Sequence, residues 1–353
     1  MVGAGVFGRN HLRVYRELER AGYPVELAAV VDSNEAARLR AAVEYDIPAF
    51  ASIEECMAAN AASRLHPTHG DETAMDGAPR RSRRIDAASV CVPTVHHASA
   101  ARGLMDRGVD LLIEKPLAAS LLEADEIISR AHERGRIVQV GHLERFNPAV
   151  RAVRGLLNQP MFFEVHRLSV FTPRSLDVDV VLDLMIHDLD IVLSLVPSPV
   201  REVRAVGLPV LSPKVDIANV RLEFENGCVA NFTASRVSTE RVRKMRFFQP
   251  HQYLSLDFAR QDLLLIDVSA AKGMDLRQIA AMAGAGGHPS GGMSMSHVPV
   301  EQGEPLRLEM ESFLECVRKR QQPVVTAEDG RAALSLALEI NAAIAAHARR
   351  TGL

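Results

Sequence analysis

One apolar segment carries carboxylates and a histidine at spacings that could support proton transfer. In VVLDLMIHDLDIVL, Asp183, His187 and Asp190 stand at positions i, i+4 and i+7, so a regular helix would place them in one polar stripe. The helix contains no Lys, Arg or Glu, which predicts that the stripe is buried. A carboxylate can then orient the imidazole and stabilise its protonated form, as a general base requires. Two alternatives stay open, a metal site whose further ligands are not placed and a core histidine with a capping Asp.

A lysine follows another apolar run, at a position suited to act on a hydroxyl group. DLLIEKPLA predicts a strand that ends at Glu114 and Lys115 and is stopped by Pro116. Ligands of open parallel sheets lie beyond the carboxyl ends of the strands, where a lysine could stabilise a developing alkoxide. The Lys115–Pro116 bond is also a candidate cis peptide. The alternative is a solvated salt bridge between Glu114 and Lys115.

A glycine loop at the start of the chain points to a dinucleotide. Gly3, Gly5 and Gly8 form G-x-G-x-x-G before a predicted helix, and Asp32 ends the next apolar run. In this context the pyrophosphate lies at the helix N-terminus and the carboxylate binds the adenosine ribose. A carboxylate there repels a 2′-phosphate, which favours NAD over NADP. The alternative is a cluster of turn glycines with a helix-capping Asp.

The strand before this loop is short, because only Met1 and Val2 precede Gly3. A central parallel strand usually runs about five residues, so we expect a first strand that lacks roughly three to six residues. The expectation is that the start is set too late or that the chain is a truncated form.

Residues 1–146 predict a parallel sheet with helices on both faces, because apolar runs alternate with helical patterns. In VPTVHH a run ends at Pro93 and Thr94 and a helix begins at His97, so groups there could face a cofactor or cap that helix. Residues 58–84 break the pattern and predict an inserted solvated loop, with a phosphate-binding patch at RRSRR as the alternative.

Residues 147–353 predict a second domain, of α+β type, for substrate binding and oligomerisation. Its β-rich runs and turn signals such as ENG indicate a largely antiparallel sheet. One apolar helix is expected near 180–196, and two helices, near 305–320 and 327–349, close the chain. Residues 283–297, rich in Gly, Ser and Met, predict a mobile loop.

Composition excludes several function classes. The 353-residue chain is 47 % hydrophobic and 24 % charged with a net charge of −3, so no overall field attracts nucleic acid or an anionic membrane. The longest apolar stretch carries three Asp and a His, which a membrane span tolerates poorly. The cysteines lack metal or redox spacing and no signal peptide is visible, which predicts a cytoplasmic protein with reduced thiols. They are Cys56, Cys91, Cys228 and Cys316.

Together and in this order, the glycine loop, VPTVHH, EKP and D-x-x-x-H resemble the Gfo/Idh/MocA family of nicotinamide-dependent oxidoreductases. The resemblance covers nearly the whole chain and implies a Rossmann domain followed by an α+β domain. It implies that Lys115, Asp183 and His187 surround the reacting carbinol, and it implies no metal. The implied cofactor contacts are Gly3, Gly5, Phe7, Gly8, Asp32, Ser33, Pro93, Thr94, His97, Glu114 and Lys115.

A narrower likeness rests on GHLERFNPAV, EVHRLSVF, VDIAN, ENGCVANFTASRVS and Tyr253. This set is similar to bacterial UDP-N-acetylglucosamine 3-dehydrogenases, and implies oxidation of a nucleotide-sugar hydroxyl for the 3-amino sugar of lipid A. A pathway aminotransferase and a homo-oligomer are the implied partners. A cyclitol or another sugar as substrate, or a non-catalytic sensor of NAD or sugar, are the alternatives.

The same likeness gives expected substrate contacts at Arg145, Asn147 and Arg167. Arginine suits a diphosphate because its planar fork binds two oxygens at once. The alternative is that Arg145 and Arg167 pair with Glu144 and Glu164 across the seam between the domains.

Overall fold

The computed structural model describes residues 1–353 except 66–83, 173–177, 273, 275–276, 279–292 and 353. It divides into two compact units, Met1–His142 with Leu306–Arg331 and Leu143–Pro305 with Ala332–Leu353. The expected boundary after residue 146 differs from this division. The first unit ends at His142, and residues 306–331 return to it from late in the chain.

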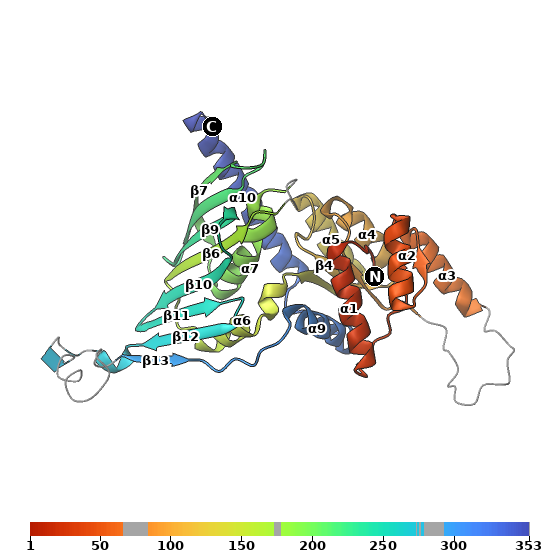
Figure 1. Ribbon diagram of the computed structural model, residues 1–353, viewed down its shortest axis with the longest axis horizontal. Helices are drawn as coiled ribbons and strands as arrows, with labels where there is room; N and C mark the ends of the chain where they lie inside the picture. Colours follow the sequence, from red (N-terminus) through yellow and green to blue (C-terminus); the bar gives the residue numbers. More distant parts are fainter. Residues whose placement is uncertain (66–83, 173–177, 273, 275–276, 279–292, 353) are drawn as a thin grey trace. The chain divides into compact units, whose positions relative to one another are not determined.

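The first unit is a parallel sheet flanked by helices (Figure 1). Strands β1 and β2 form one parallel pair, and β3, β4 and β5 form a parallel three-stranded sheet. This confirms the Rossmann-type architecture expected for the first half of the chain. The elements are α1 (Val6–Arg20), β1 (Val30–Val31), α2 (Glu35–Tyr45), β2 (Ala49–Phe50), α3 (Ile53–Leu65), β3 (Ala87–Val90), η1 (Thr94–His96), α4 (His97–Met105), β4 (Asp110–Glu114), α5 (Leu121–Arg134), β5 (Val138–Gly141) and α9 (Pro305–Lys319).

Val2 occupies the place of the expected first strand. It bridges β1 at Val31 and β3 at Val90, so one residue joins the two groups of strands. Val2 N donates to Ser89 O and Gly3 N donates to Val31 O, both at 2.8 Å. These bonds continue the ladder on both sides, so the glycine loop starts from a paired position.

The return of α9 to the first unit has a hydrophobic cause. Leu12 and Leu18 of α1 share one buried cluster with Met310 and Phe313 of α9. All four side chains are fully buried, so folding removes them completely from water. Burying such a side chain contributes about 1.5–3 kcal/mol, which fixes α9 to this unit.

Two expected loops are partly regular structure. Residues 58–65 continue helix α3, because AANAAS consists mostly of residues that tolerate a helix. The rest of that insertion, 66–83, lies outside the described residues. Ser294–His297, expected in a mobile loop, form β13 and pair with β12. Residues 283–292 of that loop also lie outside the described residues.

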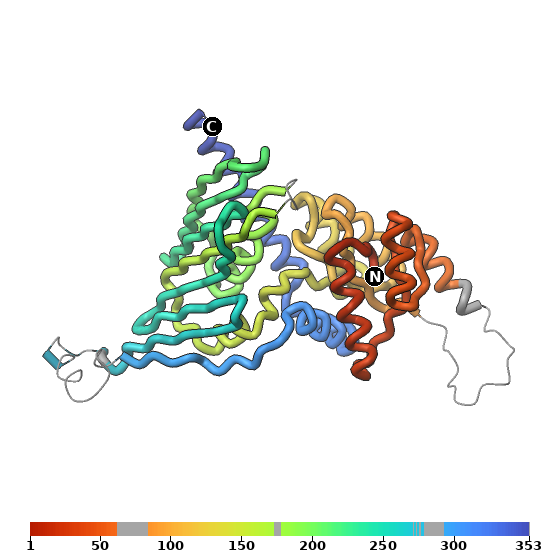
Figure 2. The backbone as a smooth tube through the Cα atoms, viewed as in Figure 1, coloured from red at the N-terminus to blue at the C-terminus, as the bar shows by residue number. Residues whose placement is uncertain are grey.

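The second unit is an eight-stranded sheet with order β13-β12-β11-β10-β6-β9-β8-β7. Only β6 and β9 pair in parallel, which confirms a largely antiparallel sheet. Figure 2 shows β10, β11 and β12 as successive hairpins. The elements are η2 (Leu143–Phe146), α6 (Pro148–Val153), η3 (Arg154–Leu156), β6 (Phe162–Val170), η4 (Val181–Met185), α7 (Ile186–Leu195), β7 (Val200–Leu208), β8 (Ile217–Phe224), β9 (Val229–Ser238), β10 (Val242–Gln249), β11 (Gln252–Asp257), β12 (Asp262–Asp267), η5 (Ser269–Ala271), β13 (Ser294–His297) and α10 (Ala327–Thr351).

Helices α6, α7 and α10 cover one face of this sheet (Figure 1). Phe163, Phe232 and Phe247 point from the strands into the same core as Leu189 of α7 and Ile340 of α10. Burial alternates along β8, as expected for a sheet with one covered face. Among the described residues, none of the helices combines the length and apolar character that a membrane span needs.

Candidate functional site

The glycine loop has two positions that demand glycine and one that opens onto space. Gly3 has a φ of +91°, and a Cβ there would lie 2.6 Å from Cys91 O. A Cβ at Gly8 would lie 2.0 Å from Gly3 O. At Gly5, the N-cap of α1, a Cβ would meet no atom within 4 Å. The loop therefore packs closely on itself while the helix N-terminus stays open, where the motif binds a pyrophosphate.

Asp32 lies against this loop at the end of β1. Its Oδ2 accepts a hydrogen bond from Ala4 N at 2.6 Å, and its Oδ1 accepts one from Asn34 N at 2.8 Å. The carboxylate is thus fixed between the loop and the start of α2, with Ser33 directly after it. This is the position from which an acidic residue binds the adenosine ribose. The residues present fit a nicotinamide dinucleotide.

Strand β4 ends at Glu114 and Lys115 follows it directly, and the Lys115–Pro116 peptide is cis, as the sequence suggested. Glu114 Oε1 lies 3.0 Å from Nε2 of His11, a fully buried residue of α1. The Phe7 ring meets His11 edge-on with ring centroids 5.3 Å apart. One contact chain therefore runs from the glycine loop to the residue before Lys115.

His11, Glu114 and Cys91 also bring three potential metal-ligand atoms within 4.8 Å of one another. Burial and the neighbouring Glu114 raise the pKa of the Cys91 thiol well above its usual range. His11 and Glu114 are moreover bonded to each other.

Pro93 and Thr94 follow β3, where Pro93 precedes the short helix η1. His97 is 1 % exposed, with Nε2 at 3.0 Å from Val92 O and Nδ1 at 3.0 Å from Pro116 O. Burial lowers the pKa of His97, although these carbonyls oppose the shift. The ring therefore connects the segment after β3 to the segment after β4, and the expected contact of His97 with a cofactor stays a prediction.

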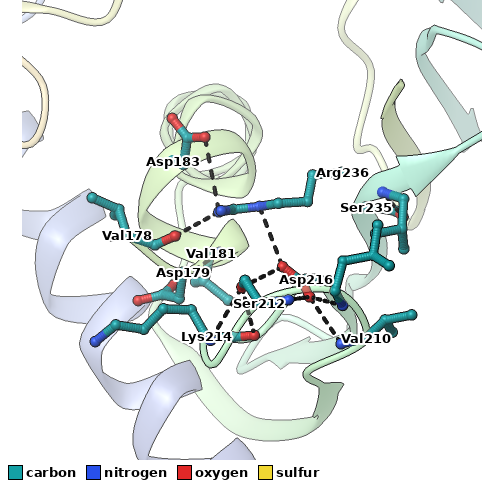
Figure 3. A network of polar contacts seen from close by, with 12 residues as sticks. Val178, Asp179, Val181, Asp183, Val210, Ser212, Lys214, Asp216, Ser235 and Arg236 are labelled. Carbon is teal, nitrogen blue, oxygen red and sulfur yellow. Dashed lines mark hydrogen bonds and ion pairs between the residues drawn. The ribbon is translucent and has the colours of Figure 1, made fainter. Parts of the chain in front are cut away.

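In the second unit, Asp183 and His187 lie on two kinds of helix. Asp183 belongs to η4, a π-helical turn, and His187 is the second residue of α7. Asp183 Oδ2 lies 3.9 Å from Arg236 Nη2 (Figure 3). Asp190 is 2 % exposed and lies 3.5 Å from Arg145 Nε. The stripe was expected to be buried, whereas the Asp183 side chain is 30 % exposed.

The three expected substrate contacts are engaged inside the second unit. Arg167 binds Asp188 and Glu144, at 2.7–3.1 Å, and all three are nearly fully buried. The two carboxylates raise the pKa of Arg167, although burial alone would lower it.

Asn147 caps α6 through Ala149 N and donates to Phe258 O. Arg167 and Glu144 form the ion pair that was the alternative interpretation. Arg145 has Asp190 as its partner, and Glu164 lies 3.8 Å from Arg246 instead. These contacts favour ion pairing within this unit as the local role of both arginines.

A cavity of about 860 Å³ in the first unit is a separate feature. Its lining includes Leu27, Ala87, Gly108 and Asp110, which lie at the amino ends of the strands. Dinucleotides bind beyond the carboxyl ends, so this cavity is not the glycine-loop site.

Sequence reasoning missed four residues that support the site. Asp188 lies within a quoted motif and His11 lies three residues after Gly8, but their partners are distant in sequence. Arg236 and Asp216 stood in TASRVS and VDIAN, which supported the resemblance without an assigned role. The signal available at Arg236 was a charged residue in a strand that carries no other charge.

Comparison with known proteins agrees with this geometry. The profile of the oxidoreductase family with an NAD-binding Rossmann fold matches residues 1–142, and that of the GFO/IDH/MocA C-terminal domain matches residues 149–249. UDP-N-acetylglucosamine 3-dehydrogenase of Acidithiobacillus ferrooxidans is 32 % identical over 352 residues, 99 % of this chain and 98 % of that protein. A solved structure of that enzyme superposes with a TM-score of 0.80 at 31 % identity, covering 98 % of this chain and 96 % of the other.

A second relative has another substrate in its name. The scyllo-inositol 2-dehydrogenase (NAD⁺) of Bacillus subtilis is 26 % identical over 260 residues, 69 % of this chain and 70 % of that protein. Both relatives are dehydrogenases, and both halves of the chain match the same family. The chain belongs to the Gfo/Idh/MocA family of oxidoreductases, whose first domain is an NAD-binding Rossmann fold.

Proposed function

We propose that this protein oxidises a nucleotide sugar with NAD⁺, converting UDP-N-acetylglucosamine to its 3-keto derivative. The observation that carries the proposal is the similarity to the Acidithiobacillus enzyme, at 32 % identity across 99 % of this chain. The position of Asp32 beside the glycine loop supports NAD rather than NADP, because a 2′-phosphate would meet its charge.

The proposed mechanism divides acid–base work among three side chains. Bound NAD⁺ supplies the hydride acceptor. His187 takes the hydroxyl proton, and Asp183 orients its imidazole and stabilises the imidazolium. The Lys115 ammonium stabilises the alkoxide that develops as the C–H bond breaks. Lys115 belongs to the first unit and the other two belong to the second.

The product has a clear chemical use. A 3-keto sugar is the substrate that an aminotransferase needs to install a 3-amino group, so we propose a place in lipid A 3-amino sugar synthesis with such a partner. We further propose that the enzyme works in the cytoplasm as a homo-oligomer.

A cyclitol is the second candidate substrate, favoured by the similarity to the inositol dehydrogenase. Cyclitols and sugars both present a secondary hydroxyl beside a C–H bond, so the same three side chains would serve either substrate.

The test is NADH production by the purified protein with UDP-N-acetylglucosamine, coupled to an aminotransferase that removes the product. N-acetylglucosamine, UDP-glucose and myo-inositol serve as comparison substrates. The proposal expects turnover that depends on the nucleotide. Turnover with myo-inositol alone would establish the second candidate, and NAD binding without any turnover would support the sensor alternative.

A further inference from the structure

A buried arginine in the second unit connects Asp183 to a second carboxylate (Figure 3). Arg236 Nη2 lies 3.9 Å from Asp183 Oδ2, and its Nε lies 3.9 Å from Asp216 Oδ1. Nη2 also donates to Val178 O at 2.6 Å. Val178 and Asp183 belong to one segment and Asp216 to the loop before β8, so two segments of the chain hold the guanidinium.

Asp216 forms the fixed end of this arrangement. Its Oδ2 accepts hydrogen bonds from the backbone N–H groups of Val210, Leu211 and Ser212 at 2.6–2.8 Å. Its Oδ1 accepts one from the Ser212 hydroxyl at 2.7 Å. Burial would raise the pKa of Asp216, but these hydrogen bonds lower it to about 2, so the carboxylate stays ionised. Arg236 N also donates to Asp216 O at 3.0 Å, which ties β9 to the same loop.

Asp183 forms the end that reaches solvent. Its side chain is 30 % exposed, against 7 % for Arg236 and 0 % for Asp216. Its backbone is fixed as well, because Asp179 Oδ1 accepts hydrogen bonds from Val181 N and Leu182 N at the start of the helical segment. A buried pair of opposite charges thus supports one accessible carboxylate.

We propose that Arg236 is the positioning residue for Asp183, holding its carboxylate in one orientation for His187. The proposal rests on the roles proposed above for Asp183 and His187. Asp216 balances the charge of Arg236, so the cation stabilises Asp183 without a net positive charge in the interior. The π turn η4 supplies the backbone geometry that brings Asp183 to this cation.

Other charged groups surround Asp183 and contribute to its field. Asp179 lies in the same helical segment and receives a hydrogen bond from Asn341 of α10 at 3.0 Å. Lys214 lies in the loop that precedes β8 (Figure 3). Substitutions at Arg236 or Asp216 alter neither group, so the charges of Asp179 and Lys214 are the same in all variants that the test below compares.

A purely structural role makes a different prediction. If Arg236 served only to anchor Val178 and the Asp216 loop, its loss would lower stability and leave the titration of His187 unchanged. Positioning instead predicts that the pKa of His187 falls when Arg236 is lost, because a released Asp183 carboxylate no longer stabilises the imidazolium. A cation that acted only through its own charge would do the opposite, since its removal favours the imidazolium.

The experiment is an NMR titration of the histidine ring signals in the intact protein, with the His187 signal assigned by its loss in His187→Gln. Arg236→Met should lower the pKa of His187, Arg236→Lys should lower it less, and Asp216→Asn, which releases Arg236, should also lower it. Arg221→Met, at an exposed arginine of the neighbouring strand β8, is the matched control and should leave it unchanged. Thermal unfolding of each variant establishes that it is folded.

An unchanged or raised pKa of His187 in folded Arg236→Met would overturn the proposal. If Arg236→Met does not fold, the lowered pKa expected for Arg236→Lys decides the question. The readout needs no substrate, so it stands even if UDP-N-acetylglucosamine is not the substrate. With an active substrate, Arg236→Met should lower kcat about 10-fold or more while KM changes little, because Asp183 supports proton transfer.

Discussion

Arg167 binds Asp188, the residue directly after His187, through two parallel hydrogen bonds. Nε donates to Oδ2 at 2.8 Å and Nη2 donates to Oδ1 at 2.7 Å. The guanidinium also donates to Glu144 at 3.1 Å and lies 5.2 Å from the centre of the Phe258 ring. A bidentate pair of this kind has a narrow range of geometries. Strand β6 thereby fixes the first turn of α7, and with it the backbone of His187.

Replacing Arg167 by Met should destabilise the second unit strongly. The substitution keeps the side chain's length but leaves the Asp188 and Glu144 carboxylates buried without their cation. Breaking one partner of a buried ion pair costs about 3–5 kcal/mol. Urea unfolding followed by circular dichroism measures the loss. Arg221→Met, an exposed site with a hydrogen bond to Asn231, should change stability by less than about 0.5 kcal/mol.

The same variant separates the two interpretations of Arg167. If the residue served mainly to bind a diphosphate, Arg167→Met would unfold at the wild-type urea concentration and show a raised KM for the nucleotide sugar. The buried geometry predicts the reverse, a lower unfolding midpoint.

The architecture of both units followed from local patterns. Alternating apolar runs and helical segments predicted the parallel sheet, and β-rich runs with turn signals predicted the antiparallel one. The glycine loop and Asp32 were also predictable, because neighbouring residue types indicate a tight turn and the end of a strand. These features depend on neighbours a few positions apart, which a single sequence displays directly.

The partners of the buried charges could not be predicted in the same way. His11 and Glu114 are 103 positions apart, and Arg167 and Asp188 are 21 apart. Which carboxylate meets which cation depends on how strands and helices pack. The π turn that carries Asp183 could not be predicted either, since such a turn in an apolar helix leaves no periodicity signal of its own.

Replacing Asp32 by Asn should relax the preference for NAD. Asparagine can still accept the hydrogen bond from Ala4 N, but it carries no charge to repel a 2′-phosphate. Two charges about 4 Å apart interact by about 1–4 kcal/mol between bulk water and a protein surface, so the NADP⁺ to NAD⁺ ratio of kcat/KM should rise about ten-fold or more. Steady-state kinetics with both cofactors measures it. Asp46→Asn, at the exposed left-handed C-cap of α2, should leave the ratio unchanged.

Adding one methyl group at Gly141 should disturb the carboxylate before Lys115. A Cβ at this position of β5 would lie 2.7 Å from Glu114 Oε1, so the carboxylate must move from His11. Overpacking of this kind costs about 1–3 kcal/mol. We expect a lower melting temperature and weaker NAD⁺ binding by calorimetry. Gly155→Ala, where a Cβ meets nothing within 4 Å, is the control, and equal effects at both sites would contradict the assignment.

The buried ring of His97 should make stability fall on the acid side. Burial lowers the pKa of His97 from the unfolded value of about 6.5, so the folded state favours the neutral ring. The contribution of the neutral His97 ring to the free energy of unfolding is therefore fully present above pH about 6.5. It is lost as the pH falls through the lower pKa of the folded state. Urea unfolding across this range should show that the free energy of unfolding falls more steeply toward acid pH in the wild type than in His97→Gln. His132→Gln, at a histidine 72 % exposed in the same unit, should retain the wild-type slope.

Removing the proposed acid–base groups should separate chemistry from cofactor binding. Lys115→Met and His187→Gln each remove a group that acts on the hydroxyl proton or the alkoxide, and such groups contribute about 10²–10⁴-fold to turnover. The contacts of Asp32 and the glycine loop are unchanged, so the Kd for NAD⁺ should stay within a few-fold of wild type. The chain contains no Trp, so NADH fluorescence can be followed without interference from tryptophan. Lys244→Met, at a half-exposed lysine of β10 paired with Asp257, should keep full turnover, and wild-type rates in both site variants would remove Lys115 and His187 from the mechanism.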